Sequence, residues 1–384
     1  MMVTCSALRW KDDARLMTMR WLLGGLIILL TPGGAQARGQ AHPARAEGWA
    51  EAQPLPAPRE RSAVDVGRDG SIYVFGGDSS GKYYNTTFIY HPRANRWSTG
   101  APMPTARNDA RAVTLPDGRI IVLGGTASCT DNYACVALKT AEIYSPARDS
   151  WTTAAPLRTA RYLFGAALSR NGRVYAIGGL SGNQVLSSVE TYSPARNQWT
   201  EGPAALPTAA IGFPAVAIGA GAIVAVGGQN YGPHGPNDLN SMFIYNGVSW
   251  RRGAPLPTAR FELGAAALPD GRIYTVGGVS VSGYMATVEA YNPLTDRWSS
   301  TVPLPQTRCC LGVAALPSGD LYVIGGGSGA GVRDQVLTLH IAASPGLVAV
   351  ATTPGDYRGV PLGSGQRLRS SDNGYPHEKE QWHA

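Results

Sequence analysis

Five arginines recur at one equivalent position along this chain, and Ala210 stands at that position in the one copy that lacks an arginine. Arginine forks bind carboxylate, phosphate or sulfate bidentately. Two such charges about 10 Å apart repel each other by roughly 1–2 kcal/mol at an effective dielectric of 20, so a cluster needs a reason. Either an anionic ligand binds there, or each guanidinium bonds carbonyls of the neighbouring repeat. The candidate ligand-binding arginines are Arg59, Arg107, Arg161, Arg260 and Arg308.

Two carboxylates lie two residues after this arginine position. Asp109 and Glu262 occur in the second and fifth copies, and either could act as a general acid or base on a sugar. Paired carboxylates of a glycosidase stand about 5–10 Å apart. We expect opposite copies to lie further apart, so that each carboxylate neutralises a nearby arginine.

Two long loops add polar and aromatic groups that could bind a sugar or a peptide. They are TASCTDNYACVALK and QNYGPHGPNDLNS, and the candidate binding residues in them are Tyr133, Tyr231 and His234. Long loops on a rigid scaffold often carry specificity. The alternative is that they are solvated, variable loops. We expect the binding hypothesis to gain if these loops share a face with the arginines.

The cysteines indicate disulfides more than metal ligands. Cys129 and Cys135 flank the short segment TDNYA, and we expect a disulfide between them in an oxidising compartment. Cys309 and Cys310 are adjacent and could form a vicinal disulfide, remain thiols, or pair elsewhere. No histidine lies near these cysteines, and the sequence has no P-loop, GxSxG or HExxH signature, so we expect no metal and no cofactor.

The elements that must position these residues form a sixfold repeat. An apolar stretch ending in Gly-Gly recurs at Gly77, Gly125, Gly179, Gly228, Gly278 and Gly326, with spacings of 48, 54, 49, 50 and 48 residues. A tyrosine, a tryptophan and a proline-rich turn follow most copies, as in Tyr144, Trp151 and APLRTAR. Each copy predicts four short strands, whose apolar faces can be buried by stacking the sheets radially.

This motif set resembles the kelch repeat. The resemblance covers about three quarters of the chain and implies an all-β, six-bladed propeller over residues 47–342. Some kelch propellers bind acidic peptides through similarly placed arginines, and the fold also resembles that of periplasmic sialic acid mutarotases. The resemblance specifies function weakly, since one fold hosts unrelated activities.

The two ends of the chain lie outside this ring. Residues 1–37 have the pattern of a signal peptide, with an apolar run from Trp21 to Leu30 and a cleavage site after Ala37; an uncleaved membrane anchor is the alternative. We expect a linker at 38–46 and a largely disordered tail at 343–384. The sixth copy lacks its tryptophan, so we expect residues around Gly48 to Gln53, including Trp49, to supply its outer strand and close the ring.

These observations favour a secreted or periplasmic binding or scaffold protein that recognises an acidic group on a protein or glycan. The net charge is +7, yet the arginines and lysines are scattered, so we expect no nucleic acid partner. We also expect a monomer without a membrane span after signal cleavage. One alternative is a carbohydrate-active enzyme of the mutarotase type, acting on an acidic sugar through Glu262 or Asp109. A purely structural envelope protein is another.

Overall fold

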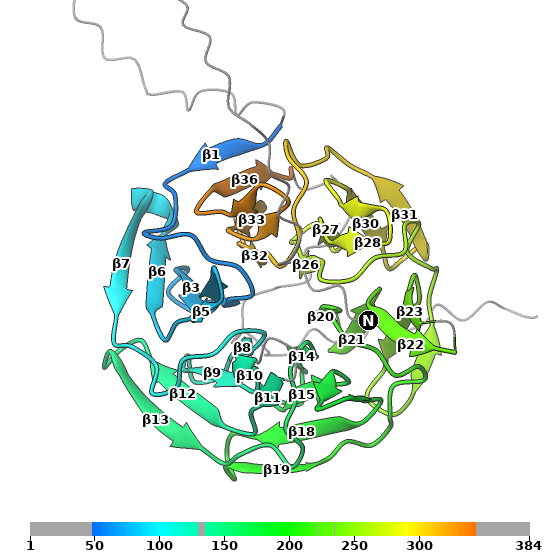
Figure 1. The fold of residues 1–384 in the computed structure, drawn as a ribbon, viewed down its shortest axis with the longest axis horizontal. Coiled ribbons are helices and arrows are strands. Elements are labelled where there is room, and N and C mark those ends of the chain that lie inside the picture. The colour runs from blue at the N-terminus through cyan, green and yellow to red at the C-terminus, as the bar shows by residue number, and fades with distance from the viewer. Residues whose placement is uncertain (1–47, 130–134, 220, 234, 343–384) are drawn as a thin grey trace, which may run out of the picture. The chain divides into compact units, whose positions relative to one another are not determined.

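The computed structural model describes residues 48–129, 135–219, 221–233 and 235–342. The expected signal peptide, linker and tail, and also Tyr133 and His234, lie outside these residues. The described chain forms six four-stranded antiparallel sheets around a central axis (Figure 1). Over the same residues, no helix is long and apolar enough to cross a membrane.

Each sheet is one blade, and five blades are built from consecutive segments of the chain. Listed from the innermost strand outward, the first blade has β2 (Ala63–Val66), β3 (Ile72–Phe75), β6 (Thr87–His91) and β7 (Arg96–Gly100), with the 3-10 turn η1 (Pro92–Ala94) between the last two. The second has β8 (Arg111–Thr114), β9 (Ile120–Leu123), β12 (Ala141–Ser145) and β13 (Ser150–Ala154). The third has β14 (Gly165–Leu168), β15 (Val174–Ile177), β18 (Val189–Ser193) and β19 (Gln198–Glu201). The fourth has β20 (Ala215–Ile218), β21 (Ala222–Val226), β24 (Met242–Tyr245) and β25 (Trp250–Arg252), and the fifth has β26 (Gly264–Ala267), β27 (Ile273–Val276), β30 (Val288–Asn292) and β31 (Arg297–Ser300).

The sixth blade joins the two ends of the described chain. Its inner three strands are β32 (Gly312–Ala315), β33 (Asp320–Ile324) and β36 (Val336–His340), and its outer strand is β1 (Ala50–Ala52). The strand β1 pairs antiparallel with β36 in the register Ala50 to Thr338 and Ala52 to Val336. Figure 1 shows β1, in blue, beside β36, in orange. The outer strand of this blade therefore comes from the segment upstream of the first repeat.

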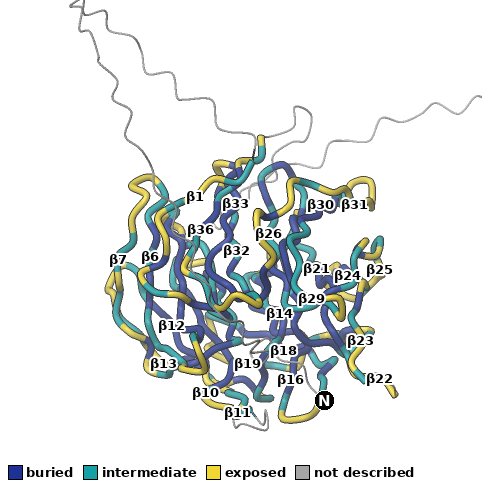
Figure 2. Tube along the Cα trace, turned by 45° about the horizontal axis from the view of Figure 1, so that its top comes forward, coloured by how far each residue is buried: buried dark blue, intermediate teal, exposed yellow. Residues whose placement is uncertain are grey.

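The inner strands form a continuous ring. Each of β2, β8, β14, β20, β26 and β32 contacts the next, and β32 contacts β2. The predicted all-β, six-bladed propeller is confirmed by this arrangement. Figure 2 shows the buried chain in the inner and middle strands, with exposed residues in the outer strands and at the turns.

The repeated tyrosine and tryptophan pack each blade against its neighbour. In the second blade the rings of Tyr144 and Trp151 lie 5.1 Å apart. The Tyr144 hydroxyl donates a hydrogen bond to Asp149 at 2.6 Å, and the Trp151 indole donates one to the carbonyl of Ala101, in the segment that follows the first blade, at 2.8 Å. The Tyr144 ring is thus buried and the Trp151 ring partly buried, while the polar group of each side chain has a hydrogen-bond partner.

The Gly-Gly pairs allow the backbone of one blade to approach the next closely. Gly124 and Gly125 have φ values of 61° and 90°. The N–H of Gly125 donates to the carbonyl of Arg161, which precedes the third blade, at 2.9 Å. A Cβ on Gly124 would stand 2.6 Å from that same carbonyl oxygen, so a side chain cannot fit without displacing backbone.

A short hairpin follows each Gly-Gly pair, and we call these six the rim hairpins. They are β4–β5 (Asp78–Ser79, Lys82–Tyr83), β10–β11 (Thr126–Cys129, Cys135–Ala137), β16–β17 (Leu180–Ser181, Gln184–Val185), β22–β23 (Gln229–Gly232, Gly235–Asp238), β28–β29 (Val279–Ser280, Gly283–Tyr284) and β34–β35 (Gly327–Ser328, Gly331–Val332). In Figure 2 the labels β10, β11, β16 and β22 lie together along the lower edge.

Candidate functional site

The five repeated arginines are buried, each just before the inner strand of a blade. Their exposed fractions run from 0% to 4%. Arg161 represents the set: its Nη1 donates to the carbonyls of Gly178 at 2.8 Å and Ser188 at 3.1 Å, and its Nη2 lies 2.8 Å from Glu190 Oε1. These partners all belong to the third blade, whose inner strand begins four residues after Arg161. The guanidinium therefore links segments of the third blade that are separated in the sequence.

The other four arginines vary this arrangement. Arg107 pairs with Glu142 at 2.7 Å and Arg260 with Glu289 at 2.6 Å, both within their own blades. Arg308 donates to Gly325 and to Gln335 instead, and the Arg59 guanidinium lies 3.5 Å from the centre of the Tyr84 ring. The arginines are therefore structural, but the expectation of carbonyls from the neighbouring repeat is wrong. Four of the guanidinium groups reach the first glycine carbonyl of the Gly-Gly pair in their own blade, and these are Arg107, Arg161, Arg260 and Arg308. Almost no guanidinium surface is left for a ligand.

The fourth blade shows an apolar replacement for the ion pair. Ala210 stands at the arginine position, and Phe243 occupies the strand position that Glu190 has in the third blade. Both Ala210 and Phe243 are buried in one hydrophobic cluster. The blade thus loses the cation and the carboxylate together, which avoids an unpaired buried charge.

Two residues beyond each arginine position, six residues form a ring around the axis that we call the axial collar. All have positive φ, between 50° and 62°. Their backbones are linked in series: the N–H of Asp109 donates to the carbonyl of Arg61 at 3.0 Å, and the N–H of Arg61 to that of Cys310 at 2.8 Å. Equivalent bonds run from Cys310 to Glu262, from Glu262 to Gly212 and from Gly212 to Leu163, at 2.6–3.0 Å. The collar consists of Arg61, Asp109, Leu163, Gly212, Glu262 and Cys310.

Charged side chains converge on Arg61 within this collar. Its Nη1 donates to Glu60 at 2.8 Å and to Asp78 at 3.4 Å. Its Nε lies 4.0 Å from Asp109 Oδ1 and 4.0 Å from Glu262 Oε1. Because both oxygens lie at that distance from one nitrogen, they are at most about 8 Å apart. The expectation that Asp109 and Glu262 are too far apart to act together is therefore wrong, since the collar is narrow.

Burial strongly raises the pKa of two carboxyl groups in this cluster, those of Asp109 and Glu60. Burial raises the pKa of Asp109 to about 7, against the opposing effect of Arg61. Burial likewise raises the pKa of Glu60 to about 7, with Arg61 again opposing. Burial lowers the pKa of Arg61, but Glu262 and the other carboxylates together raise it well above its usual value. The side chains of Arg61, Asp109 and Glu262 keep 10%, 13% and 9% of their surface exposed, so solvent reaches them.

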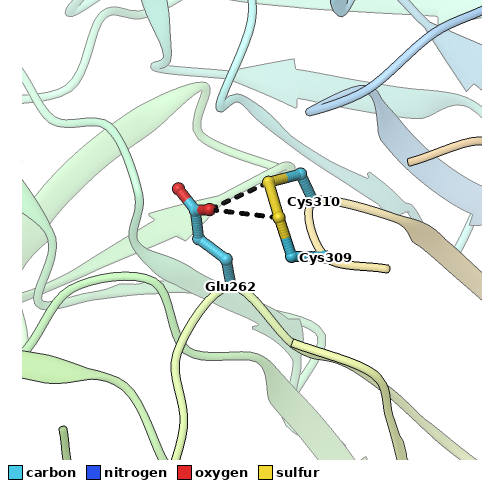
Figure 3. Close-up of side chains that lie close together, drawn as sticks. All are labelled: Glu262, Cys309 and Cys310. Carbon is cyan, nitrogen blue, oxygen red and sulfur yellow. Dashed lines mark hydrogen bonds between the residues drawn. A yellow bond between two sulfur atoms is a disulfide. The ribbon is translucent and has the colours of Figure 1, made fainter. Parts of the chain in front are cut away.

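A pair of cysteines borders the same cluster. Cys309 and Cys310 are bonded to each other, one of the alternatives that the sequence leaves open. Glu262 Oε2 lies 2.8 Å from Cys310 Sγ and 3.6 Å from Cys309 Sγ (Figure 3). Cys129 and Cys135 also form a disulfide, which joins the two strands of the β10–β11 rim hairpin.

The rim hairpins surround the collar on one face. Isolated bridges join Asn108 to Thr126 and Ile211 to Gln229, so each hairpin begins beside the residue that precedes a collar residue. Neighbouring hairpins also touch, because Tyr83 Oη donates to Cys129 Sγ at 3.0 Å. The two long loops therefore share a face with the collar. Tyr231, 38% exposed, lies in one of them, and its pKa is raised by burial and by the charge of Glu262.

Several functional candidates were not predicted as binding residues. Arg61, Glu60 and Asp78 form the charged centre, and Cys309 with Cys310 borders it. The signal that could have found Arg61 and Cys310 is their register, since both occupy the same repeat position as Asp109 and Glu262. No comparable signal marks Glu60 or Asp78, which come from different positions of the repeat.

Four segments of the chain match the Kelch motif, at residues 63–104, 110–158, 161–204 and 263–305. No curated protein matches the sequence. Among solved structures, that of YjhT matches with a TM-score of 0.63 and 16% sequence identity, over 74% of this chain and 95% of that one. This likeness concerns the fold. The chain is a kelch-repeat β-propeller of six blades.

Proposed function

We propose that this protein binds a hydroxyl-rich ligand, such as a sugar unit of a glycan, over the axial collar. The observation that carries the proposal is the pair of carboxyl groups, Asp109 and Glu262, held on either side of Arg61 with part of their surface exposed. Ionised carboxylates accept hydrogen bonds from sugar hydroxyls, and the rim hairpins add aromatic side chains such as Tyr83 and Tyr231.

The backbone of the collar supports this location. Five of its residues are not glycine, yet all adopt the left-handed conformation, which costs an L-residue about 1–2 kcal/mol. Strain of this kind clusters at ligand sites, where the surrounding structure maintains it. Here a series of backbone hydrogen bonds maintains it.

The charge of the site favours a neutral ligand over the acidic one expected from the arginine positions. Four carboxyl groups, those of Glu60, Asp78, Asp109 and Glu262, surround Arg61. Arg61 and Arg111 both act as cations on Asp109, whereas the five repeated arginines are buried within the blades. An added anion would face a net negative cluster, which opposes its binding.

A second candidate function is acid–base catalysis on the bound sugar. Asp109 Oδ1 and Glu262 Oε1 are at most about 8 Å apart, which is below the upper limit of the separation that paired carboxylates of glycosidases use, about 5–10 Å. A carboxyl group with a pKa of about 7 both gives and accepts a proton at neutral pH. The likeness to mutarotases inferred from the kelch repeats supports chemistry on a sugar, but not the preference for a neutral one.

We also propose that the protein works outside the cytoplasm. The apolar run from Trp21 to Leu30, followed by the small residues Ala35 and Ala37, supports export. Two disulfides, at residues 129–135 and 309–310, support an oxidising compartment.

Saturation-transfer NMR with a panel of neutral and acidic monosaccharides tests the proposal. We expect a neutral sugar to bind the wild type, and Asp109→Asn and Glu262→Gln each to weaken it at least tenfold. The matched control is Asp117→Asn, an exposed carboxylate on the β8–β9 turn, which should leave binding unchanged. If no sugar binds, or if the control weakens binding as much, the proposal fails. Anomer exchange in the same spectra, lost in Asp109→Asn at saturating sugar, would establish the second candidate.

A further inference from the structure

The group formed by Glu262, Cys309 and Cys310 has the composition of a metal site. Their ligand atoms, one carboxylate oxygen and two sulfurs, all lie within 4.8 Å of one another. Cys309 is fully buried and Cys310 nearly so. Figure 3 shows both sulfurs facing the same carboxylate oxygen. We infer that, when the cysteine pair is reduced, these three side chains bind a thiophilic divalent cation of the Zn²⁺ class.

The carboxylate is oriented for this role. Glu262 Oε2 faces the sulfurs at 2.8 and 3.6 Å, whereas Oε1 faces Arg61 Nε at 4.0 Å. One oxygen is thus directed at the proposed ion while the other is held by a cation outside the ligand set. Such outer partners orient metal ligands and typically change metal affinity 10–100-fold.

The backbone holds the ligands in place independently of any ion. Glu262 N–H donates to Gly212 at 2.6 Å, and Cys310 N–H donates to the carbonyl of Glu262 at 3.0 Å. Glu262 and Cys310 therefore belong to the hydrogen-bonded series of the axial collar. Their backbone conformation, with positive φ, sets the direction of their Cα–Cβ bonds. Preorganisation of this kind is what a metal site requires of its scaffold.

One of the three ligand distances already suits tetrahedral coordination, and the other two must open after reduction. With Zn–S of about 2.3 Å and Zn–O of about 2.0 Å, ligand atoms on a tetrahedron stand about 3.5–3.8 Å apart. The Oε2 to Cys309 Sγ distance already lies in that range, and the Cys310 sulfur would have to move by about 1 Å. Three protein ligands leave the fourth position for water, as in open zinc sites.

The redox state of the cysteines controls the site. In the disulfide form the sulfurs are bonded to each other and cannot act as thiolates. A dithiol reductant supplies two electrons and two protons, becomes a disulfide itself, and leaves two thiols at Cys309 and Cys310. The cation then displaces the thiol protons. Two thiolates and Glu262 carry three negative charges, of which the divalent ion offsets two. Arg61, which Glu262 shares with Glu60, Asp78 and Asp109, lies beside the third.

This inference does not depend on sugar binding, and its test has a separate readout. The full chain carrying Cys5→Ser, Cys129→Ser and Cys135→Ser is reduced with a phosphine, freed of reductant under anaerobic conditions, and titrated with Cd²⁺ as a probe for zinc. We expect one equivalent to bind, with a thiolate-to-metal charge-transfer band in the ultraviolet. The unreduced chain should bind none.

Two variants of the same chain locate the site. Cys309→Ser/Cys310→Ser should abolish the absorption band. Glu262→Gln should retain the fold, as checked by circular dichroism, and bind Cd²⁺ at least tenfold more weakly. Binding by the oxidised chain, or equal affinity in Glu262→Gln, would overturn the inference. If the cysteine variant fails to fold, the glutamine variant still decides, because it keeps both sulfurs.

Discussion

Arg61 is the cation around which the carboxyl groups of the axial collar are organised. It was not predicted as a site residue, although its position in the repeat is the same as that of Asp109 and Glu262. The sequence register placed those two carboxylates in opposite blades correctly, but not their separation. A propeller whose inner residues are linked by single backbone hydrogen bonds has a narrow axis, and this linkage depends on backbone angles that the sequence pattern does not specify.

The raised pKa of Asp109 makes the stability of the fold depend on pH. Folding raises this pKa from 3.8 to about 7. Between these values the folded chain holds a proton that the unfolded chain has lost, so the contribution of Asp109 to the free energy of unfolding decreases as pH rises. Asp109→Asn removes this dependence and tolerates the left-handed backbone. We therefore expect the variant to gain stability over the wild type between pH 4 and pH 8, by at most about 4 kcal/mol.

Urea unfolding of both chains at pH 4 and pH 8 measures this difference. A constant gap between the two chains at both pH values would contradict the assigned pKa. Asp117→Asn serves as the control, since Asp117 is half-exposed and its ion pair with Arg119 lies at the surface. Its effect on stability should be small at both pH values.

At the scale of the element, an arginine that precedes the blade bonds groups within that blade in the second, third, fifth and sixth blades. The repeat spacing predicted the blades and the equivalence of the arginines, because both follow from local patterns. It did not predict the partners. Glu190 lies 29 residues after Arg161, in a strand whose register against the inner strands is set only by folding. The apolar pair in the fourth blade is the natural counterpart of this ion pair.

This comparison predicts how the third blade responds to substitution. Arg161→Ala leaves Glu190 buried without its cation, so we expect a loss of about 3–5 kcal/mol in the free energy of unfolding. Arg161→Ala/Glu190→Phe, which copies the fourth blade, should recover about half of that loss. Arg196→Ala, an exposed arginine on the β18–β19 turn, should change stability by less than about 0.5 kcal/mol.

Chemical denaturation of these variants, together with Glu190→Phe alone, forms a double-mutant cycle. Glu190 also accepts hydrogen bonds from the backbone N–H groups of Arg158 and Thr159. A double variant less stable than Arg161→Ala would mean that these bonds stabilise the blade independently of the arginine. In that case the ion pair would not be the contact that holds the blade together.

At the scale of the whole ring, the sixth blade combines strands from the two ends of the described chain. The missing tryptophan of the last repeat and the extra one at Trp49 predicted the strand β1, because repeat units must be completed somewhere. How deeply Trp49 is buried could not be predicted from the repeat. It is half-buried, packs beside the cluster that contains Leu304 and Leu337, and donates to the carbonyl of Val302 at 3.1 Å.

We expect Trp49→Ala to cost about 2 kcal/mol, less than the 3–5 kcal/mol typical of a fully buried aromatic residue. The melting temperature should fall accordingly, and deleting residues 38–54 should lower it much further, since β36 would then become an open edge. Val248→Ala, on a side chain that is 75% exposed, is the control. An unchanged melting temperature after the deletion would show that β1 does not hold the ring closed.

The pairing of β1 with β36 also sets the order of events when the protein is made. Glu51 and Gln335, which are hydrogen-bonded across this pair, are 284 residues apart in the sequence. A chain emerges from the ribosome, or from an export channel, N-terminus first. The strand β1 therefore cannot pair until β36, the last strand of the propeller, has emerged. Until β36 is made, the two apolar clusters that Val336 and Leu337 complete stay exposed, and the ring cannot close. A truncation that removes β36 would therefore also leave β1, at the other end of the propeller sequence, without its pairing partner.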